Sequence, residues 1–419
     1  MTIQAGLLMA SHARNARDSM FLILCVMGLF AILSSTMSKK PVLPSFAASL
    51  GTPEGFWTGL VAVASTIPGI LVSLPAGSLS DIVGRKKVLL ISSIIFASAP
   101  FLYLLINFWW QLILVRFYHG FATGMFVPVA EASIAELFPT KRGERISLFS
   151  SVAIAGRSIA PILGGSILFI TNNNFHSLYL AVGVAGITAF ITALPFLGEK
   201  KTAAKPENLK RATLCSILHG WGSIARTHGV LIVSLVEASQ YYAYGSVGFF
   251  FLKYLGEIAN LDFFLQGVIM ASQLMIVMLS KPYIGRLSDK IGRRTPIIAG
   301  SIISGIPLVT VPFFTQFPVL LFLSIIYGLG FSFVTSSTPA LVSELVSIEV
   351  VGGAMGLLST IMDVGQTLGP IICSLILVTG LGYAGLFSSL TIVLLFSCII
   401  FVLSDVAKAN LNINNKHKS

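Results

Sequence analysis

A short, basic, glycine-containing loop occurs twice in this chain, and no other feature constrains the fold as strongly. The first copy, residues 77–87, reads GSLSDIVGRKK, and the second, residues 285–295, reads GRLSDKIGRRT. Six positions carry the same residue in both copies at one offset of 208, the difference between 285 and 77. Each copy connects two long apolar segments. Six matches in one register are difficult to obtain by chance, so the second half of the chain repeats the first.

The composition indicates that the repeated unit lies in a membrane. Fifty-five per cent of the residues are hydrophobic and 10% are charged, whereas soluble domains contain roughly 25% charged residues. A soluble core does not grow this large, so lipid must be the solvent for most side chains. Twelve apolar segments, each long enough for the ~20 residues that cross a bilayer, are predicted. They lie near residues 19–45, 54–77, 88–108, 111–138, 146–171, 177–198, 229–252, 263–284, 296–315, 318–344, 352–379 and 383–404.

The placement of Lys and Arg predicts how these segments cross the membrane. If the N-terminus is cytoplasmic, 22 of the 27 basic residues fall in segments on the cytoplasmic side, as the positive-inside rule requires. The net charge of +11 is then a topology signal and does not indicate a nucleic-acid partner. We therefore expect a multi-pass protein of the cytoplasmic (inner) membrane with both termini in the cytoplasm.

The predicted fold is an all-α integral membrane protein with 12 transmembrane helices in two pseudo-symmetric six-helix bundles. Residues 1–198 form the N-terminal bundle, 199–228 a cytoplasmic linker, 229–404 the C-terminal bundle and 405–419 a cytoplasmic tail. The repeat extends beyond the loops, because Gly120 matches Gly328 at the offset of 208 and Pro161 matches Pro370 at 209. Repeated bundles of this kind are expected of transporters that rock one bundle against the other.

Three sequence elements resemble the major facilitator superfamily over essentially the whole chain. The GSLSDIVGRKK loop fits the family signature G-x-L-x-D-x-x-G-R-K/R between helices 2 and 3. The segment Arg116–Gly120 resembles the R-x-x-Q-G element of helix 4, with His119 in place of Gln. Residues 156–165 resemble the G-x-x-x-G-P-x-x-G-G element of the drug:proton antiporters, with Ala160 before the proline. The resemblance implies the 12-helix fold of this superfamily and points to its antiporter branch.

The two loops are predicted to act as gates on the cytoplasmic side. Arg85 and Glu136 fall at the ends of neighbouring spans, and so do Arg293 and Glu344, so each pair can form an ion pair at the membrane edge. The resemblance implies that Asp81 lies against the start of span 11, where a helix dipole stabilises a carboxylate by up to ~2 kcal/mol. The predicted gating residues are Gly77, Asp81, Gly84, Arg85, Glu136, Asp289, Gly292, Arg293 and Glu344.

Small residues in span 5 predict close helix packing. Gly156, Gly164 and Gly165 let a neighbouring helix approach, and Pro161 adds a bend. These residues either seal a pivoting interface or serve ordinary packing, and the two roles are compatible.

Charges inside the spans are the sharpest clue to function. A Lys, Arg or Asp at mid-bilayer costs roughly 2.5–3.5 kcal/mol, so one that is retained there usually faces a cavity or a partner. The candidates for substrate binding and proton coupling are Arg116, which occupies the position of the family's coupling arginine, and Arg157, Asp363, Glu131, Glu237 and Gln240. A proton-coupled cycle needs a carboxylate that gains and loses its proton, and Glu131, Glu237 and Asp363 remain open as that carrier. Lys39 and Lys40 either belong to this set or extend toward the outer interface.

The function expected from these features is secondary active transport of a small molecule by alternating access, coupled to protons. Export by drug:proton antiport follows from the span-5 resemblance, and import of an anionic metabolite by symport is the alternative that the basic residues suggest. An enzyme or scaffold is the competing class. The six histidines have no metal-binding or catalytic spacing, and no phosphate-binding loop is present, so we expect no enzymatic activity, no metal and no cofactor. The expected partners are substrate, protons and lipid, and the expected state is a monomer.

Overall fold

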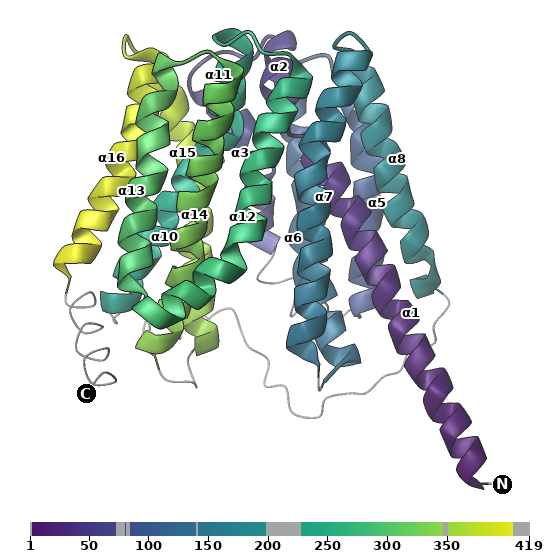
Figure 1. Ribbon diagram of the computed structural model, residues 1–419. Helices are drawn as coiled ribbons and strands as arrows, with labels where there is room; N and C mark the ends of the chain where they lie inside the picture. Colours follow the sequence, from purple (N-terminus) through teal and green to yellow (C-terminus); the bar gives the residue numbers. More distant parts are fainter. Residues whose placement is uncertain are drawn as a thin grey trace, which may run out of the picture.

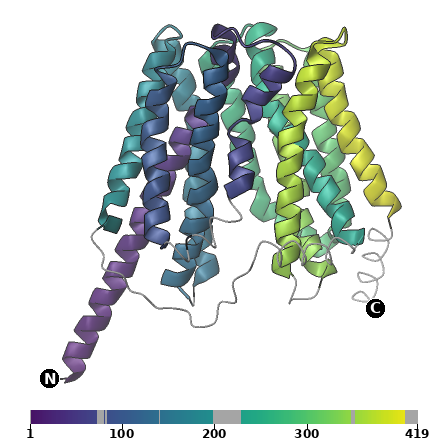
Figure 2. The same ribbon diagram turned by 180° about the vertical axis from the view of Figure 1, so that it is seen from behind.

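The computed structural model describes residues 2–72, 80, 84–139, 141–197, 228–346 and 351–404, and every regular element in these ranges is a helix. The helices form two bundles that stand side by side (Figures 1 and 2). The start of α1 (Thr2–Met37) and the end of α16 (Gly382–Leu403) lie on the same side of the molecule. We call this side the terminal face and the opposite side the far face.

The first bundle begins with α1, whose membrane-crossing part starts at Arg17. Its other elements are α2 (Leu43–Ser49), α3 (Phe56–Val63), α5 (Arg85–Tyr103), α6 (Trp109–Leu137), α7 (Arg142–Ile170), α8 (Phe175–Ala193) and the short turn η1 (Leu194–Leu197). Within this bundle α5 packs against α6 and α8, and α1 packs against α7 and α8.

The second bundle repeats this arrangement. Its elements are α10 (His228–Ser246), the π-helical turn η2 (Val247–Phe251), α11 (Leu252–Glu257), α12 (Phe263–Ile291), α13 (Arg294–Thr310), η3 (Val311–Phe313), α14 (Phe317–Leu345), α15 (Val351–Leu377) and α16. Here α10 packs against α15, α14 against α12 and α13, and α13 against α16. Outside the described residues lie 199–227 of the predicted linker 199–228, the tail from 405 to 419, and the gating residues Gly77 and Asp81. Residue 228, predicted as the last of the linker, is the first residue of α10.

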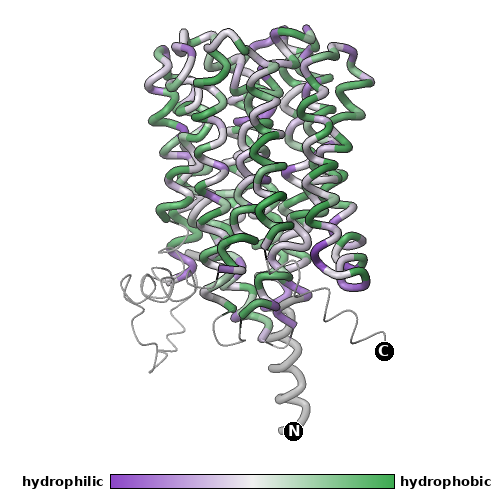
Figure 3. The backbone as a smooth tube through the Cα atoms, turned by 90° about the vertical axis from the view of Figure 1, so that its left-hand side faces the viewer, coloured by the Kyte–Doolittle hydropathy of each residue, from purple (hydrophilic) through white to green (hydrophobic). Residues whose placement is uncertain are grey.

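The lengths and the composition of the helices confirm an all-α membrane protein. Ten helices in the described part are long and apolar enough to cross a membrane, and they correspond to ten of the twelve predicted spans. Span 2 is interrupted, because α3 ends at Val63 and the helix resumes at residue 66, and span 7 contains the π-helical turn between α10 and α11. Hydrophobic residues dominate the middle of the chain trace, and hydrophilic residues are more frequent near the two faces (Figure 3). Lipid supplies no hydrogen bonds to the backbone, so the spans must be helical.

Among the described residues, the one buried hydrophobic cluster that contains side chains of both bundles lies toward the far face. Its members include Phe46 and Tyr179 of the first bundle and Phe250 and Phe387 of the second. Toward the terminal face, each bundle has a separate core in the described part of the chain. The far face is therefore closed by shared apolar packing.

Glycines bring the helices of the two bundles into backbone contact near the far face. A Cβ on Gly165 of α7 would collide with the carbonyl oxygen of Phe263 at the start of α12. A Cβ on Gly267 of α12 would likewise collide with the carbonyl oxygen of Pro161. A third contact joins α3 to α15, where a Cβ on Gly59 would lie 2.8 Å from the Cα of Ile371. Such contacts need glycine, since any side chain would separate the helices.

Candidate functional site

Six charged side chains from both bundles lie near two tyrosines of α10 or near one another, in the middle part of the molecule. We call this group the central charged site. It consists of Lys39, Lys40 and Arg157 from the first bundle and Glu237, Lys281 and Asp363 from the second. The charges of Glu237, Asp363 and Arg157 all act on the Tyr241 ring, and those of Lys40, Arg157 and Lys281 act on Tyr244. The structure thus brings the predicted residues Arg157, Asp363 and Glu237 together with three lysines.

Aromatic rings of α10 and α14 form one wall of this site. The ring of Phe331 lies 5.0 Å from that of Tyr244, with 25° between the two planes, and 5.3 Å from that of Tyr241. The ammonium of Lys40 lies 5.1 Å from the centre of the Tyr244 ring, within the range of a cation–π interaction. Lys40 therefore reaches from the first bundle to the second, and an aromatic surface lies beside the charges.

Arg157 is the exposed charge of the site, whereas Asp363 and the three lysines are half-buried. The groups near Arg157 are Lys39, which follows α1, Tyr244 of α10 and Lys281 of α12, so Arg157 lies where the two bundles approach each other. Neither Arg157 nor Asp363 forms an ion pair with another described residue. An unpaired charge at this depth usually serves a substrate or an ion.

Glu237 and Gln240 lie deeper in the second bundle. Glu237 is 3% exposed and accepts a hydrogen bond from the hydroxyl of Thr338 on α14, and the charge of Lys281 acts on it. Gln240 is fully buried, and neither atom of its amide has a hydrogen-bond partner in the described structure. Buried amides are normally paired. Gln240, which directly precedes Tyr241 in the chain, therefore has unused hydrogen-bonding capacity in the described structure.

Arg116 is not one of the six charges of the central charged site, although its charge acts on Lys39. It is 1% exposed, and its guanidinium binds the interrupted span 2. Its Nε donates to the carbonyl of Val61 at 2.8 Å, and its Nη2 donates to the carbonyl of Ala62 at 3.2 Å and to the Ser65 hydroxyl at 3.1 Å. The end of a helix leaves such carbonyls without partners. Arg116 therefore braces the break in span 2, and His119, one turn later, is also buried.

Glu131, the remaining acidic candidate, lies near the terminal face on α6. Its side chain is half-buried and faces Ser150 of α7. The structure therefore places it within the first bundle, away from the aromatic wall.

Both ion pairs predicted at the repeated loops are present on the terminal face. Arg85 lies 3.0 Å from Glu136 and also donates to the carbonyl of Ala132. Arg293 binds Glu344 at 2.9 Å. Gly84 and Gly292 precede these arginines with φ of 103° and 89°, values that favour glycine.

Arg293 has a second acidic partner, Asp289, at 2.5 Å. Partial burial alone lowers the pKa of the Arg293 guanidinium. The hydrogen bonds and negative charges of Glu344 and Asp289 outweigh this effect, so the pKa lies above its ordinary value. The charged form of Arg293 therefore holds the end of α12 against α14 within the second bundle.

The span-5 glycines serve two different interfaces. A Cβ on Gly156 would lie 2.8 Å from the carbonyl oxygen of Leu29, and one on Gly164 would lie 3.1 Å from the Met37 side chain, so both pack α7 against α1. Gly165 instead faces α12 of the other bundle, as does the carbonyl of Pro161. The motif both builds the first bundle and joins it to the second.

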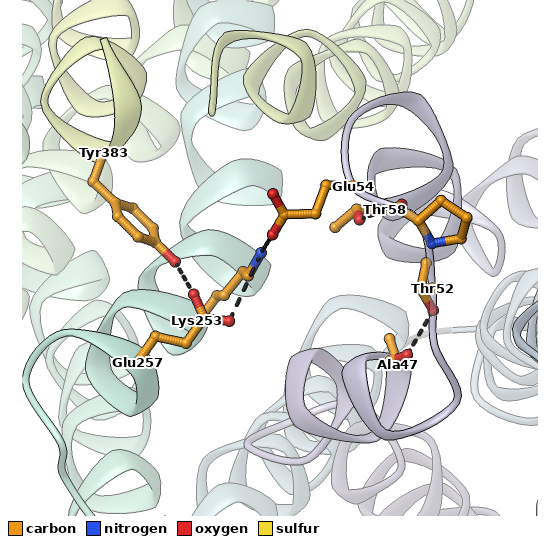
Figure 4. Close-up of polar contacts among 8 residues, drawn as sticks. Ala47, Thr52, Glu54, Thr58, Lys253, Glu257 and Tyr383 are labelled. Atoms are coloured by element: carbon orange, nitrogen blue, oxygen red, sulfur yellow. Dashed lines mark hydrogen bonds and ion pairs between the residues drawn. The ribbon is translucent and has the colours of Figure 1, made fainter. Parts of the chain in front are cut away.

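A polar latch closes the far face between the bundles (Figure 4). Lys253 of α11 lies 2.9 Å from Glu54, which precedes α3 in the first bundle. The same ammonium lies 3.7 Å from Glu257, and the Tyr383 hydroxyl donates to Glu257 at 2.8 Å. We call these four residues the far-face latch. The sequence did not predict it, because its members are separated by up to 329 positions (383 minus 54).

Lys281 is a site residue that sequence reasoning missed. It was counted with the basic loop after span 8, but it lies inside α12, ten residues before that helix ends. The predicted span, 263–284, already contained this position, which was the available signal.

Comparisons with known proteins agree on one family. The profile described as the Major Facilitator Superfamily matches residues 19–251 and 233–418. A Lactococcus lactis protein named multi-drug resistance efflux pump PmrA homolog is 27% identical over 362 residues, with 83% of this chain and 86% of the relative covered. The multidrug resistance protein MdtG of Enterobacter lignolyticus is 24% identical over 387 residues, with 90% of each chain covered.

Solved structures show the same fold. A bacterial homolog of the human lysosomal transporter Spinster, described as inward-facing and unoccupied, has a TM-score of 0.74 at 15% identity, covering 94% of this chain and 98% of its own. The nucleoside transporter NupG has a TM-score of 0.73 at 14% identity, with 92% and 98% covered.

Proposed function

The chain belongs to the major facilitator superfamily, and from this premise we propose that it exports small amphipathic molecules in exchange for protons. It is a multi-pass membrane transporter and not an enzyme. The relative named as a multi-drug resistance efflux pump homolog supports export, and the relative named as a multidrug resistance protein is consistent with it. The termini are proposed to be cytoplasmic on the Lys and Arg distribution, in which case the terminal face is the cytoplasmic side of the inner membrane. The two bundles are proposed as domains 1–198 and 229–404 of a monomer.

The main support for transport by alternating access is the distribution of the buried cores. One hydrophobic cluster and the far-face latch join the bundles on the far side, whereas the bundles have separate cores on the terminal side. This is the arrangement expected of one end state in alternating access, in which a rocking motion opens one side at a time. The central charged site lies where the two bundles approach each other, and either state would expose it to one side.

Proton coupling is proposed for the acids of the central charged site. Asp363 is half-buried and unpaired in the described structure, and Glu237 is buried with Thr338 and Lys281 as neighbours. A carboxylate whose neighbours change between two states binds protons differently in each. Arg157 and Gln240 are proposed to contact the substrate.

The direction of proton movement tests this proposal. The protein is reconstituted into liposomes that contain a pH-sensitive dye, and a permanently charged candidate substrate is added outside. An antiporter lets substrate enter while protons leave, so the lumen becomes more alkaline, and Asp363→Asn should abolish the change. Lumen acidification would contradict export by antiport and would support the alternative, a symporter for an anionic metabolite, which the surplus of basic side chains favours. Protein-free liposomes control for passive entry.

A further inference from the structure

The central charged site contains more positive than negative side chains, and its cations are not each matched by an acid. Four cations, Lys39, Lys40, Arg157 and Lys281, face two acids. Every charged group that acts on Lys39 is positive, namely Arg116, Arg157 and Lys40. Cations crowded at mid-depth of a membrane repel one another and are expensive to retain. A bound anion would relieve this repulsion.

The two acids do not neutralise Lys40 or Arg157. Glu237 is buried and already has the Thr338 hydroxyl and the charge of Lys281 beside it. Asp363 lies on α15 and forms no ion pair with another described residue. Lys40 has an aromatic ring as its neighbour, and Arg157 has no carboxylate within ion-pair distance in the described structure. These two donors are therefore free for a ligand.

The aromatic wall adds a second element of recognition. Tyr241 and Tyr244 are half-buried, Phe331 packs against both from within the bundle, and the Lys40 ammonium lies 5.1 Å from the centre of the Tyr244 ring. Rings of this kind stack against planar apolar groups, while the cations bind acidic groups through charge-assisted hydrogen bonds. A ligand that fits both elements has an aromatic body and an acidic group attached to it.

We propose that the central charged site selects aromatic amphiphiles with an anionic group, such as sulfonates or carboxylates, and rejects cationic ones of the same shape. This inference rests on the proposed function, because it assigns a substrate class to the transport site. Selection includes repulsion, since a cationic analogue would meet four like charges. An acidic lipid headgroup carries the same chemistry, so the experiment must separate it from a soluble compound.

The test uses two probes that share a naphthalene ring and differ in permanent charge: naphthalene-2-sulfonate and (2-naphthylmethyl)trimethylammonium. The full chain is placed in nanodiscs of phosphatidylcholine, which has no net charge, and each Kd is measured by calorimetry. We expect the sulfonate to bind at least about tenfold more tightly than the ammonium compound. Arg157→Gln and Lys40→Gln should each weaken sulfonate binding by about tenfold. Lys290→Gln, which removes an exposed lysine on α12, should not change it.

Several outcomes would overturn the inference. They are tighter binding of the ammonium compound, binding of neither probe, or sulfonate binding within about twofold of the parent in both site variants. Arg157→Lys and Lys40→Arg retain the charge, so they should keep the preference even if the Gln variants fold poorly. If adding phosphatidylglycerol abolishes sulfonate binding, the site belongs to a lipid headgroup and the substrate assignment fails. If the sulfonate binds selectively but moves no protons in liposomes, the proposed function fails and the charge preference stands.

Discussion

The contact between Gly165 and Phe263 gives a direct way to shift the equilibrium between the two end states. Gly165 of α7 and Phe263 of α12 belong to different bundles, so we expect this contact to break when the far face opens. An alanine Cβ at position 165 would collide with the carbonyl oxygen of Phe263 and lie 3.0 Å from its carbonyl carbon. These are backbone atoms, which no side-chain rotation can remove from the contact. Gly165→Ala must therefore separate the helices or strain them.

The magnitude follows from the cost of overpacking. One additional methyl group in a close-packed contact costs about 1–3 kcal/mol. If the strain is present only when the far face is closed, the ratio of closed to open molecules falls by about 5-fold to about 160-fold. Such a change turns a minor open state into a substantial population.

The assay is a distance measurement between the bundles at the far face. Spin labels are placed at Asn107→Cys, between α5 and α6, and at Thr315→Cys, between η3 and α14, after the four native cysteines are replaced. Both positions are exposed. Pulsed electron resonance should show a longer-distance population in Gly165→Ala that is small or absent in the parent.

Gly186→Ala is the matched control. A Cβ on Gly186 of α8 would also collide with a carbonyl oxygen, that of Phe96, but within the first bundle. It should lower stability without lengthening the distance between the labels. An unchanged distance distribution in Gly165→Ala, or an equal shift in Gly186→Ala, would refute the reasoning that the far face is closed by this contact.

Two further predictions concern polar groups. Lys253→Gln removes the ion pair with Glu54, and because Glu54 is largely exposed, the expected effect is ~0.2–1 kcal/mol, which is about a 1.4-fold to 5-fold gain of the open far face by the same spin labels. High salt should weaken this ion pair in the parent protein, so that its open population approaches that of the variant. An equal gain of the open population after Lys141→Gln on the terminal face would contradict this role. Arg116→Gln leaves carbonyls of span 2 without their donors, at about 1–3 kcal/mol for each unsatisfied group, so thermal unfolding in detergent should occur at a lower temperature. Loss of transport with an unchanged unfolding temperature would instead assign Arg116 to proton coupling.

Much of the fold was predictable because it depends on local composition. The apolar segments, the repeated loops and the offset of 208 are properties of short stretches of sequence. The ion pairs of Arg85 with Glu136 and of Arg293 with Glu344 were predictable for the same reason, since adjacent spans place their ends side by side. The breaks in spans 2 and 7 were not predicted, because membrane helices tolerate interruptions where neighbouring groups satisfy the backbone, as Arg116 does at Val61.

The site was predictable only in part, because it depends on contacts between the bundles. Arg157, Glu237 and Asp363 were recognised as charges inside spans, and the structure brings them together. Lys281 was not recognised as a charge inside a span although the predicted span 263–284 contains it, because it lies close to the basic residues of the loop that follows. The far-face latch joins Glu54 to Lys253 and cannot be read from either bundle alone.

The charge of the central site and the direction of transport are separate properties. The side chains of the site bear on the charge of the ligand and do not by themselves determine the direction. The basic residues first suggested import of an anion, but a cation such as Arg157 binds an anionic ligand equally well in an exporter. Direction depends on how protons and substrate compete for the site, which involves Asp363 and Glu237. A bound anion near Asp363 or Glu237 disfavours the ionised form of that carboxylate. In symport, sulfonate and proton bind together, so sulfonate binding should cause proton uptake. In antiport, substrate and proton replace each other, so sulfonate binding should cause proton release. Proton release or uptake on sulfonate binding, measured in weakly buffered solution, therefore separates the two cycles before any transport is observed.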